Sequence, residues 1–412
     1  MRGIQHLELM PEPEDPSLLT AVDSDAPGYP GEVYGVSDRE AREMRWPAGP
    51  IMKLLWPWGA IVFSVSTVVI ILAWSTIAPM LGYVLPDSEW AYEDSGIRGL
   101  QDLGLTGEGV RVCMVDTGID ISHPDLSTVM LSGFRDLYYS QNEDVRDIGL
   151  DSHGTMMAGL LAANGTYLGA APGISLSVAI ALGPAGKSTD ERMISQAIRW
   201  CRISQEADII SLSLGSEPGM GMGIESETIA AVIEALDAGI FVIAAAGNSD
   251  ISFNDSDVST PASIDRVIAV GAHSWDSSAW EDSAIGSNID PINGEKRQFP
   301  NQKPEISAPG VLLWSCTNSD KNPPYAYSTG TSDSTVLVTG ALALILEAHG
   351  TSISGTDEKI DSDEMNLVKV ALAKSATNSP DQVGAHDSKL GYGLLNAEAW
   401  SSQVALEFAS DD

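Results

Sequence analysis

The sequence predicts an α/β domain with a parallel, doubly wound sheet and helices on both of its faces, preceded by one transmembrane helix. Two observations carry this prediction. From Arg111 onward, short and nearly continuous apolar runs alternate with segments of helical spacing, as in a parallel sheet covered on both faces. Ahead of them, residues 54–86 contain no charged residue and are long enough to cross a bilayer.

Residues 1–50 are expected to form a disordered cytoplasmic tail. They hold 10 Asp and Glu against 4 Lys and Arg, are rich in proline, and lack apolar periodicity.

Residues 51–86 are predicted to be the transmembrane anchor region, with the chain contacting the membrane through residues 54–86. Tryptophans that can anchor at the interfaces lie near both ends of the densest apolar part: Trp56, Trp58 and Trp74. Basic residues gather only on the N-terminal side: Arg39, Arg42, Arg45 and Lys53. The positive-inside rule then places the C-terminal domain outside the cytoplasm of a single-pass cell-membrane protein. A cleavable signal peptide is the rival interpretation, but some fifty mostly polar, proline-rich residues precede the apolar core.

Residues 87–106 are interpreted as a linker and residues 107–412 as the globular domain. The expected strands are the apolar runs 111–115, 176–182, 208–213, 240–245 and 267–271. The expected helices are 153–163, 190–205 (with Ser188 or Thr189 as N-cap), 226–238, and one that Ser332 opens and that runs to about Ala348.

Four side chains in small-residue turns supply the parts for acyl transfer: Asp116, His153, Asn248 and Ser332. A serine nucleophile needs a base to remove its proton, a carboxylate to orient that base, and a donor for the oxyanion. Asp116 and Asn248 each follow an expected strand, and active sites of such sheets lie at the carboxyl ends of the strands. Each residue alone also has an ordinary interpretation, as a turn former, a helix-entry residue or an N-cap.

The order Asp, His, Ser is that of subtilisin-type proteases, and the chain resembles the subtilase family of serine endopeptidases. The resemblance runs from about Gly107 to Ala399. Its motifs are Val115–Gly118, Ser122–Leu126, Ser152–Thr155, Ser211–Gly215, Ala246–Ser249, Lys303–Gly310, Gly330–Ser332 and Gly391–Ala397.

The resemblance implies a subtilisin-like fold, polypeptide substrates, and a catalytic set of Asp116, His153, Ser332 and Asn248. It also implies that an extended peptide binds along exposed strands. The walls of the pocket for the residue before the scissile bond would be Ser213, Leu214 and Gly215 on one side and Ala245, Ala246 and Gly247 on the other. Asp250 and Asp255 could favour a basic side chain there, although a solvated loop is the other interpretation.

Three departures from the family pattern matter. Asp333 follows the nucleophile where the family has methionine. Residues 162–169 are shorter than the family's calcium-binding loop, and Asp125 alone cannot supply the six or more oxygens that calcium needs. No cofactor is therefore expected, and calcium, although possible, is not supported by this segment. Residues 87–106 leave no room for the family's folded propeptide, which puts activation by autoprocessing in doubt.

Composition argues against two further classes of protein, those that bind nucleic acid and those held together by a disulfide scaffold. The net charge of −35 leaves no basic stripe to neutralise phosphates, so nucleic acid is not an expected partner. The three cysteines, Cys113, Cys201 and Cys316, are too few for a disulfide scaffold, and burial is the default for the first two.

The sequence therefore predicts a membrane-anchored, extracytoplasmic serine endopeptidase. An inactive subtilase fold that binds peptides or acts as a scaffold is the first alternative, and an esterase or transpeptidase with the same acyl-enzyme is the second.

Overall fold

The computed structural model describes residues 50–77, 88–139, 144–187, 190–215, 225–248, 257–290, 294–355 and 359–409. The chain divides into two units, Met1–Val84 and Leu85–Asp412. Most of the predicted N-terminal tail, together with residues 78–87, Ser188, Thr189, Asp250 and Asp255, lies outside the described residues.

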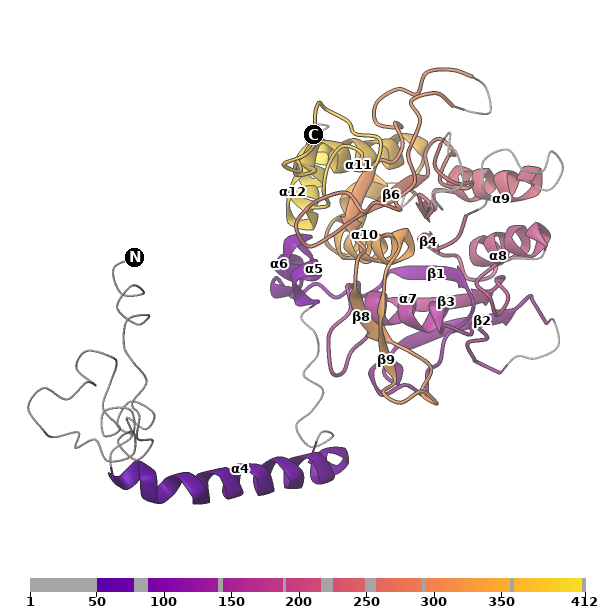
Figure 1. The fold of residues 1–412 in the computed structure, drawn as a ribbon. Coiled ribbons are helices and arrows are strands. Elements are labelled where there is room, and N and C mark those ends of the chain that lie inside the picture. Colours follow the sequence, from indigo (N-terminus) through magenta and orange to yellow (C-terminus); the bar gives the residue numbers. More distant parts are fainter. Residues whose placement is uncertain are drawn as a thin grey trace, which may run out of the picture. The chain divides into compact units, whose positions relative to one another are not determined.

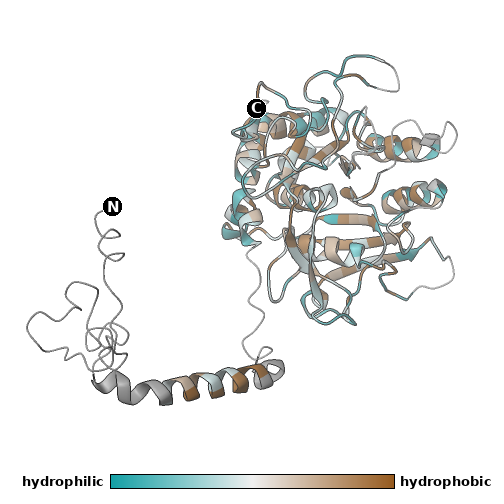
Figure 2. Ribbon diagram, in the orientation of Figure 1, coloured by the Kyte–Doolittle hydropathy of each residue, from teal (hydrophilic) through white to brown (hydrophobic). Residues whose placement is uncertain are grey.

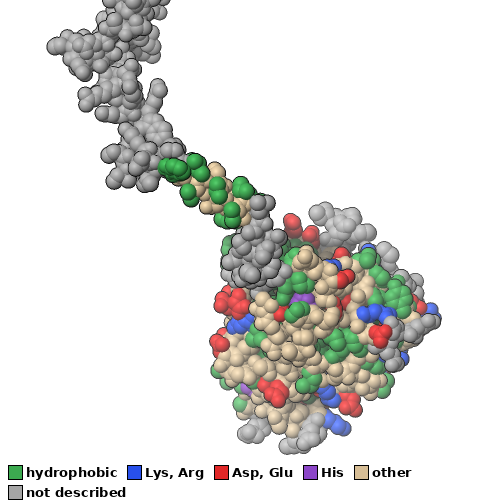
Figure 3. All heavy atoms as spheres, turned by 90° about the horizontal axis from the view of Figure 1, so that it is seen from below, with side chains coloured by type: hydrophobic (Ala, Val, Ile, Leu, Met, Phe, Trp, Pro, Cys, Tyr) green, Lys and Arg blue, Asp and Glu red, His purple; other side chains and the backbone are tan. Residues whose placement is uncertain are grey.

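The described residues of the first unit form one long helix, α4 (Pro50–Ile77). Its side chains from Trp58 to Ile71 are exposed, and Figure 3 shows apolar groups over this part of the helix. This described apolar stretch is shorter than a membrane span needs. Elsewhere among the described residues, only Thr331–Ser354 has the length and apolar composition of a span, and it is mostly buried inside the second unit.

The second unit is built on a parallel sheet of seven strands in the order β2-β3-β1-β4-β5-β6-β7 (Figure 1). The strands are β1 (Arg111–Asp116), β2 (Met130–Asp136), β3 (Ser175–Ile180), β4 (Ile209–Leu212), β5 (Phe241–Ala245), β6 (Ile268–His273) and β7 (Ile306–Pro309). Every residue of β4 to β7 is buried. Since successive strand residues point to opposite faces, both faces of the sheet are covered. The predicted parallel sheet is confirmed.

Helices cover the sheet in two groups. The central helix α10 (Thr331–Ser354) packs on β4 to β7 and on α7 (His153–Ala162), whereas α8 (Glu191–Ile203) and α9 (Glu225–Asp237) pack on each other and on strands. Figure 2 shows hydrophobic residues concentrated in the strands and hydrophilic ones on outlying loops. The N-cap prediction for α8 was wrong: Asp190 is the N-cap, because its carboxylate accepts a hydrogen bond from the Arg192 N–H.

Further elements complete the unit. They are α5 (Glu89–Asp94), α6 (Ile97–Asp102), the short helix η3 (Pro124–Leu126), the hairpin of β8 (Leu313–Cys316) and β9 (Tyr325–Ser328), α11 (Ser362–Ser375) and α12 (Ala397–Ala409). Residues interpreted above as a linker thus form α5 and α6, whose apolar side chains Ala91, Tyr92, Ile97 and Leu100 join the core.

A disulfide joins Cys113 in β1 to Cys201 in α8, and both cysteines are buried. The Cα atoms lie 5.7 Å apart, within the range that a disulfide spans. The sequence predicted burial for both residues and left their pairing open. The third cysteine, Cys316, is free and buried.

Candidate active site

Asp116 and His153 form a hydrogen-bonded pair at the carboxyl end of the sheet. Asp116 ends β1 and is fully buried, and His153 opens α7. The imidazole Nδ1 lies 2.7 Å from Asp116 Oδ1, which also accepts the Thr117 N–H at 2.7 Å. This contact makes Nδ1 the protonated nitrogen of the neutral ring, so Nε2 can act as a base once the ring has lost its charge.

The electrostatics of His153 favour its charged form. Burial lowers the pKa of the imidazole, but the charge and hydrogen bond of Asp116 outweigh that effect, and the charges of Asp333 and Asp147 add to them. The pKa of His153 is thereby raised to about 9. The side chain keeps 30% of its surface exposed, so it is open to a ligand from solvent.

Ser332 is the second residue of α10, where the helix presents free amides and the positive end of its dipole. Its hydroxyl donates a long hydrogen bond of 3.4 Å to the carbonyl oxygen of Ser213. Among the hydrogen bonds of the described residues, none joins Ser332 to His153. Bonds of a resting active site are often long and tighten only when substrate binds.

Asn248 follows β5 and is held by the residue before Ser332. Its Oδ1 accepts hydrogen bonds from both the N–H (3.0 Å) and the Oγ1 (2.8 Å) of Thr331. The carboxamide is therefore oriented with Nδ2 as the remaining donor. A Cβ on Gly330 would lie 3.1 Å from that nitrogen, so glycine at this position leaves the donor accessible.

The two expected pocket walls lie next to Ser332. The segments 213–215 and 245–247 extend from β4 and β5, which pair in parallel, so they leave the sheet side by side. The Ser213 hydroxyl contacts the Ser332 carbonyl at 3.4 Å, and the Gly247 N–H donates to Thr331 Oγ1 at 3.2 Å.

One residue between these walls was not predicted. A Cβ on Gly215 would lie 2.5 Å from Ser259 Cβ, and a Cβ on Gly247 would lie 2.1 Å from Ser259 Oγ. Ser259 therefore fills the space between the two glycines, and it is fixed there by a 2.7 Å bond from its N–H to the Ala246 carbonyl.

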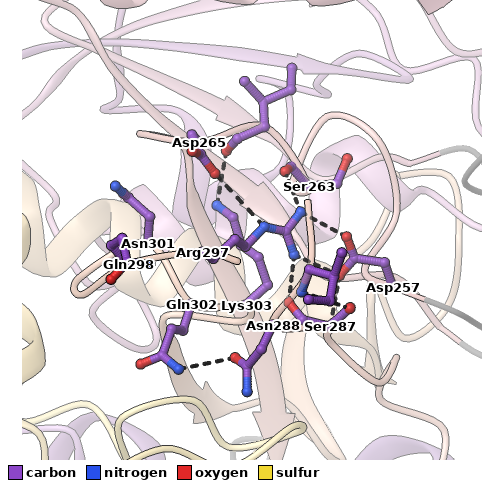
Figure 4. A network of polar contacts seen from close by, with 12 residues as sticks. Asp257, Ser263, Asp265, Ser287, Asn288, Arg297, Gln298, Asn301, Gln302 and Lys303 are labelled. Carbon is purple, nitrogen blue, oxygen red and sulfur yellow. Dashed lines mark hydrogen bonds and ion pairs between the residues drawn. The ribbon is translucent and has the colours of Figure 1, made fainter. Parts of the chain in front are cut away.

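A buried charge network supports the chain that carries Ser259. Arg297 and Asp257, which are 0% and 1% exposed, form a bidentate pair with bonds of 2.9 and 2.7 Å, and Arg297 also donates to the carbonyls of Ser263 and Ser287 (Figure 4). Nearby, Lys303 and Lys369 both bond Glu305, which precedes β7. The sequence predicted neither the Arg297–Asp257 pair nor the contacts of the two lysines with Glu305, because the residues in each network have no recognisable spacing in the sequence.

Asp333 is buried beside the site. Its Oδ2 accepts a 2.9 Å bond from Ser328, and its Oδ1 is buried with no hydrogen-bond partner among the described residues. Burial raises the pKa of this carboxyl to about 7, although Ser328 and the charge of His153 oppose the shift.

The Asp125 site does not fit a cation. Its carboxylate accepts hydrogen bonds from Thr166 N–H (2.7 Å), Thr166 Oγ1 (2.9 Å) and Tyr325 OH (2.8 Å), so donors face the oxygens that a calcium ion would need.

Its neighbours do not fit a metal ion either. The His123 nitrogens are occupied by the Asp125 N–H and the Pro324 carbonyl, and burial raises the pKa of the Cys316 thiol to about 12. The side chains of His123, Asp125 and Cys316 are close enough to share an ion. None of them, however, offers a ligand atom that is free of a hydrogen bond or a proton.

Comparison of the sequence with known proteins finds matches to subtilases. A model described as "Subtilase family" matches residues 107–393. Subtilisin DY of Bacillus licheniformis is 33% identical over 303 residues, which cover 73% of this chain and 93% of that protein. Serine protease AprX of Bacillus subtilis (strain 168) is 32% identical over 319 residues, or 71% of this chain and 66% of that protein. Subtilisin NAT of Bacillus subtilis subsp. natto is 35% identical over 256 residues, 61% of this chain, and the match spans only 59% of that protein.

Proposed function

This chain belongs to the subtilase family and is a serine-type endopeptidase, and we propose that it hydrolyses peptide bonds through Ser332, His153 and Asp116. The observation that carries this proposal is the 2.7 Å contact between His153 and the buried Asp116, at the edge of the sheet where α10 presents Ser332.

The proposed reaction has two halves. Ser332 Oγ attacks the peptide carbonyl carbon while His153 Nε2 takes the hydroxyl proton, and the resulting tetrahedral intermediate expels the amine, which receives that proton. A water molecule then attacks the acyl-enzyme with His153 again as base, and the acid product leaves with the Ser332 hydroxyl restored. Asp116 holds the imidazole in one tautomer and stabilises its cation.

Asn248 is proposed to donate from Nδ2 to the oxyanion. The two bonds from Thr331 fix the amide before substrate arrives, so little reorganisation is needed as charge develops. The N-terminal amides of α10 add donors on the same side.

Polypeptide substrates are proposed to lie along the segments 213–215 and 245–247, with backbone hydrogen bonds giving affinity. The side chain before the scissile bond would enter between these walls. Ser259 limits the depth of this slot where Gly215 and Gly247 contact it.

We further propose that residues 51–86 anchor the protein in the cell membrane with the catalytic unit outside. Support comes from α4, whose 28 residues extend roughly 42 Å at the usual helical rise, and from the absence of charged residues between Lys53 and Asp87. The Cys113–Cys201 disulfide suits an oxidising compartment. Retention in membranes after an alkaline wash supports the anchor, and release of the full-length protein contradicts it.

A fluorophosphonate probe tests the catalytic assignment. The probe should label the protein at Ser332, as mapped by mass spectrometry of the labelled peptide, and labelling should fall in the His153→Ala variant. A folded protein that resists the probe would instead favour a peptide-binding role for the fold.

A further inference from the structure

Asp147 connects the two segments that carry the proposed catalytic pair, and we propose that it is a positioning residue for Asp116 and His153. The inference rests on the proposed function, because it takes these two residues as the orienting carboxylate and the base. No motif marked Asp147, which precedes the His153 segment by several residues.

The Asp147 carboxylate accepts four hydrogen bonds, two on each oxygen. Oδ1 accepts from Thr117 Oγ1 at 2.7 Å and from the Gly149 N–H at 2.8 Å. Oδ2 accepts from the Thr155 N–H at 2.9 Å and from Thr155 Oγ1 at 2.6 Å. Since Thr117 follows Asp116 and Thr155 lies two residues after His153, one side chain ties the end of β1 to the first turn of α7.

Backbone contacts fix the carboxylate in this place. The Ile148 N–H donates to the Thr117 carbonyl at 3.0 Å, and the Ile119 N–H donates to the Arg146 carbonyl at 3.1 Å. Residues 146–148 thus run antiparallel to residues 117–119. The Gly154 N–H, in the first turn of α7, donates to Thr117 Oγ1 at 2.9 Å and so joins this turn directly to the end of β1.

Three glycines permit this close approach. An added Cβ would lie 2.1 Å from the Arg146 carbonyl oxygen at Gly118, 2.7 Å from Thr117 Oγ1 at Gly149, and 2.1 Å from the Gly118 carbonyl oxygen at Gly154. No real Cβ tolerates such distances, so the packing around Asp147 leaves little freedom for the catalytic pair to shift.

Asp147 also acts on His153 through its charge. The acidic groups that favour the charged imidazole are Asp116, Asp333 and Asp147, and the groups that bond Asp147 itself are uncharged. Removing the charge of Asp147 therefore lowers the pKa of His153, an effect that a purely structural residue would not have.

The Asp147→Asn variant tests both effects. It keeps the shape and one acceptor oxygen but removes the charge, and it turns an amide donor toward the Thr155 N–H or the Thr117 hydroxyl. We expect kcat to fall by about 10- to 100-fold with little change in KM. We also expect the midpoint of the rise of kcat/KM with pH to move to lower pH.

Asp208→Asn is the matched control. Asp208 accepts a 2.8 Å bond from the Arg111 N–H and two more from its guanidinium, at the start of β1, about 17 Å along the strand from Asp116. Its loss should lower the melting temperature and leave kcat and the pH midpoint unchanged.

Two outcomes separate the possible failures. A folded Asp147→Asn protein with the wild-type kcat and pH midpoint overturns the positioning role, provided that Ser332→Ala is inactive; an active Ser332→Ala protein overturns the proposed function instead. Should Asp147→Asn fail to fold, Thr155→Val removes the Oγ1 bond to Asp147, together with the Oγ1 contacts to Asn318 and to the Asp120 N–H, and keeps the charge of Asp147. It should lower kcat without moving the pH midpoint, with Thr155→Ser as the rescue, and a wild-type kcat in Thr155→Val overturns the inference.

Discussion

The hydroxyl of Ser328 donates a 2.9 Å hydrogen bond to Asp333 Oδ2, while Oδ1 of the same carboxyl is buried with no hydrogen-bond partner among the described residues. The carboxyl is 1% exposed and belongs to the residue directly after Ser332. A buried carboxylate oxygen that lacks a partner is costly when charged, and burial accordingly raises the pKa of Asp333 to about 7.

This relationship predicts how Asp333 affects stability. The folded pKa lies above the unfolded value, so the folded state holds the proton more tightly and stability is lost as pH rises from about 4 to about 7. Asp333→Asn imitates the protonated acid. Its melting temperature should exceed that of the wild type at pH 9 and match it only at about pH 4 and below, where the wild-type acid is protonated in both the folded and the unfolded state. A lower melting temperature at both pH values would contradict the account.

Asp333→Met tests the effect of the same residue on the reaction. If the Asp333 anion opposes the oxyanion, kcat at pH 9 should rise in this variant. If the residue only favours the start of α10, kcat should hold while stability falls by some tenths of a kcal/mol.

The raised pKa of His153 predicts alkaline activity. The base must be neutral to accept the Ser332 proton, so kcat/KM should increase with pH and level off only near or above pH 9. The matching stability effect is fully present below the unfolded pKa of about 6.5 and is lost as pH passes through about 9. A rate profile that is flat from pH 6 to pH 10 would show that another group limits the rate.

Asn248→Ala should reduce kcat by about 10²- to 10³-fold with a modest change in KM, because the amide contacts the oxyanion mainly in the transition state. Thr331→Val tests the orientation of that amide. It removes the 2.8 Å bond from Oγ1 to Asn248 and the 3.2 Å bond that Oγ1 accepts from the Gly247 N–H, but it keeps the 3.0 Å bond from the Thr331 N–H to Asn248. We therefore expect a smaller loss of kcat than in Asn248→Ala. Steady-state kinetics on one peptide substrate measure kcat and KM for both variants. If both variants raised KM and left kcat unchanged, the amide would act in ground-state binding instead.

Because hydrogen-bond donors from Thr166 and Tyr325 already occupy the Asp125 carboxylate, we predict that this site binds no calcium. Adding a chelator should leave the melting temperature of the catalytic unit unchanged, whereas Tyr325→Phe, which removes the 2.8 Å donor, should lower it. A large chelator-dependent drop in melting temperature would show that a cation binds at Asp125 or elsewhere.

The sequence predicted those elements whose local pattern agrees with their final environment. The strands β1 and β3 to β6 are short apolar runs that are buried nearly throughout, and all five were predicted. The strand β2 was missed because only its last residue is fully buried and because it contains Ser132, Gly133 and Arg135. The strand β7 was missed because it ends at Pro309, and proline is uncommon inside the strands of a sheet.

The site residues also fall into two groups, those that a local motif predicts and those that only contacts in the folded chain identify. Asp116, His153, Asn248 and Ser332 were predicted from short motifs, and their catalytic roles stay predictions. Asp147 and Ser259 could not be predicted, because what each does depends on contacts that only the folded chain makes, such as the bonds from Asp147 to Thr117 and Thr155.

The turnover rate of the Ser332→Ala protein tests the central claim most directly. With folding checked by its melting temperature, kcat on a peptide substrate should fall by about 10⁶-fold, as for subtilisin, and Ser332→Ala combined with His153→Ala should be hardly worse than either change alone. A folded Ser332→Ala protein that keeps the wild-type kcat would contradict the assignment of Ser332 as the nucleophile.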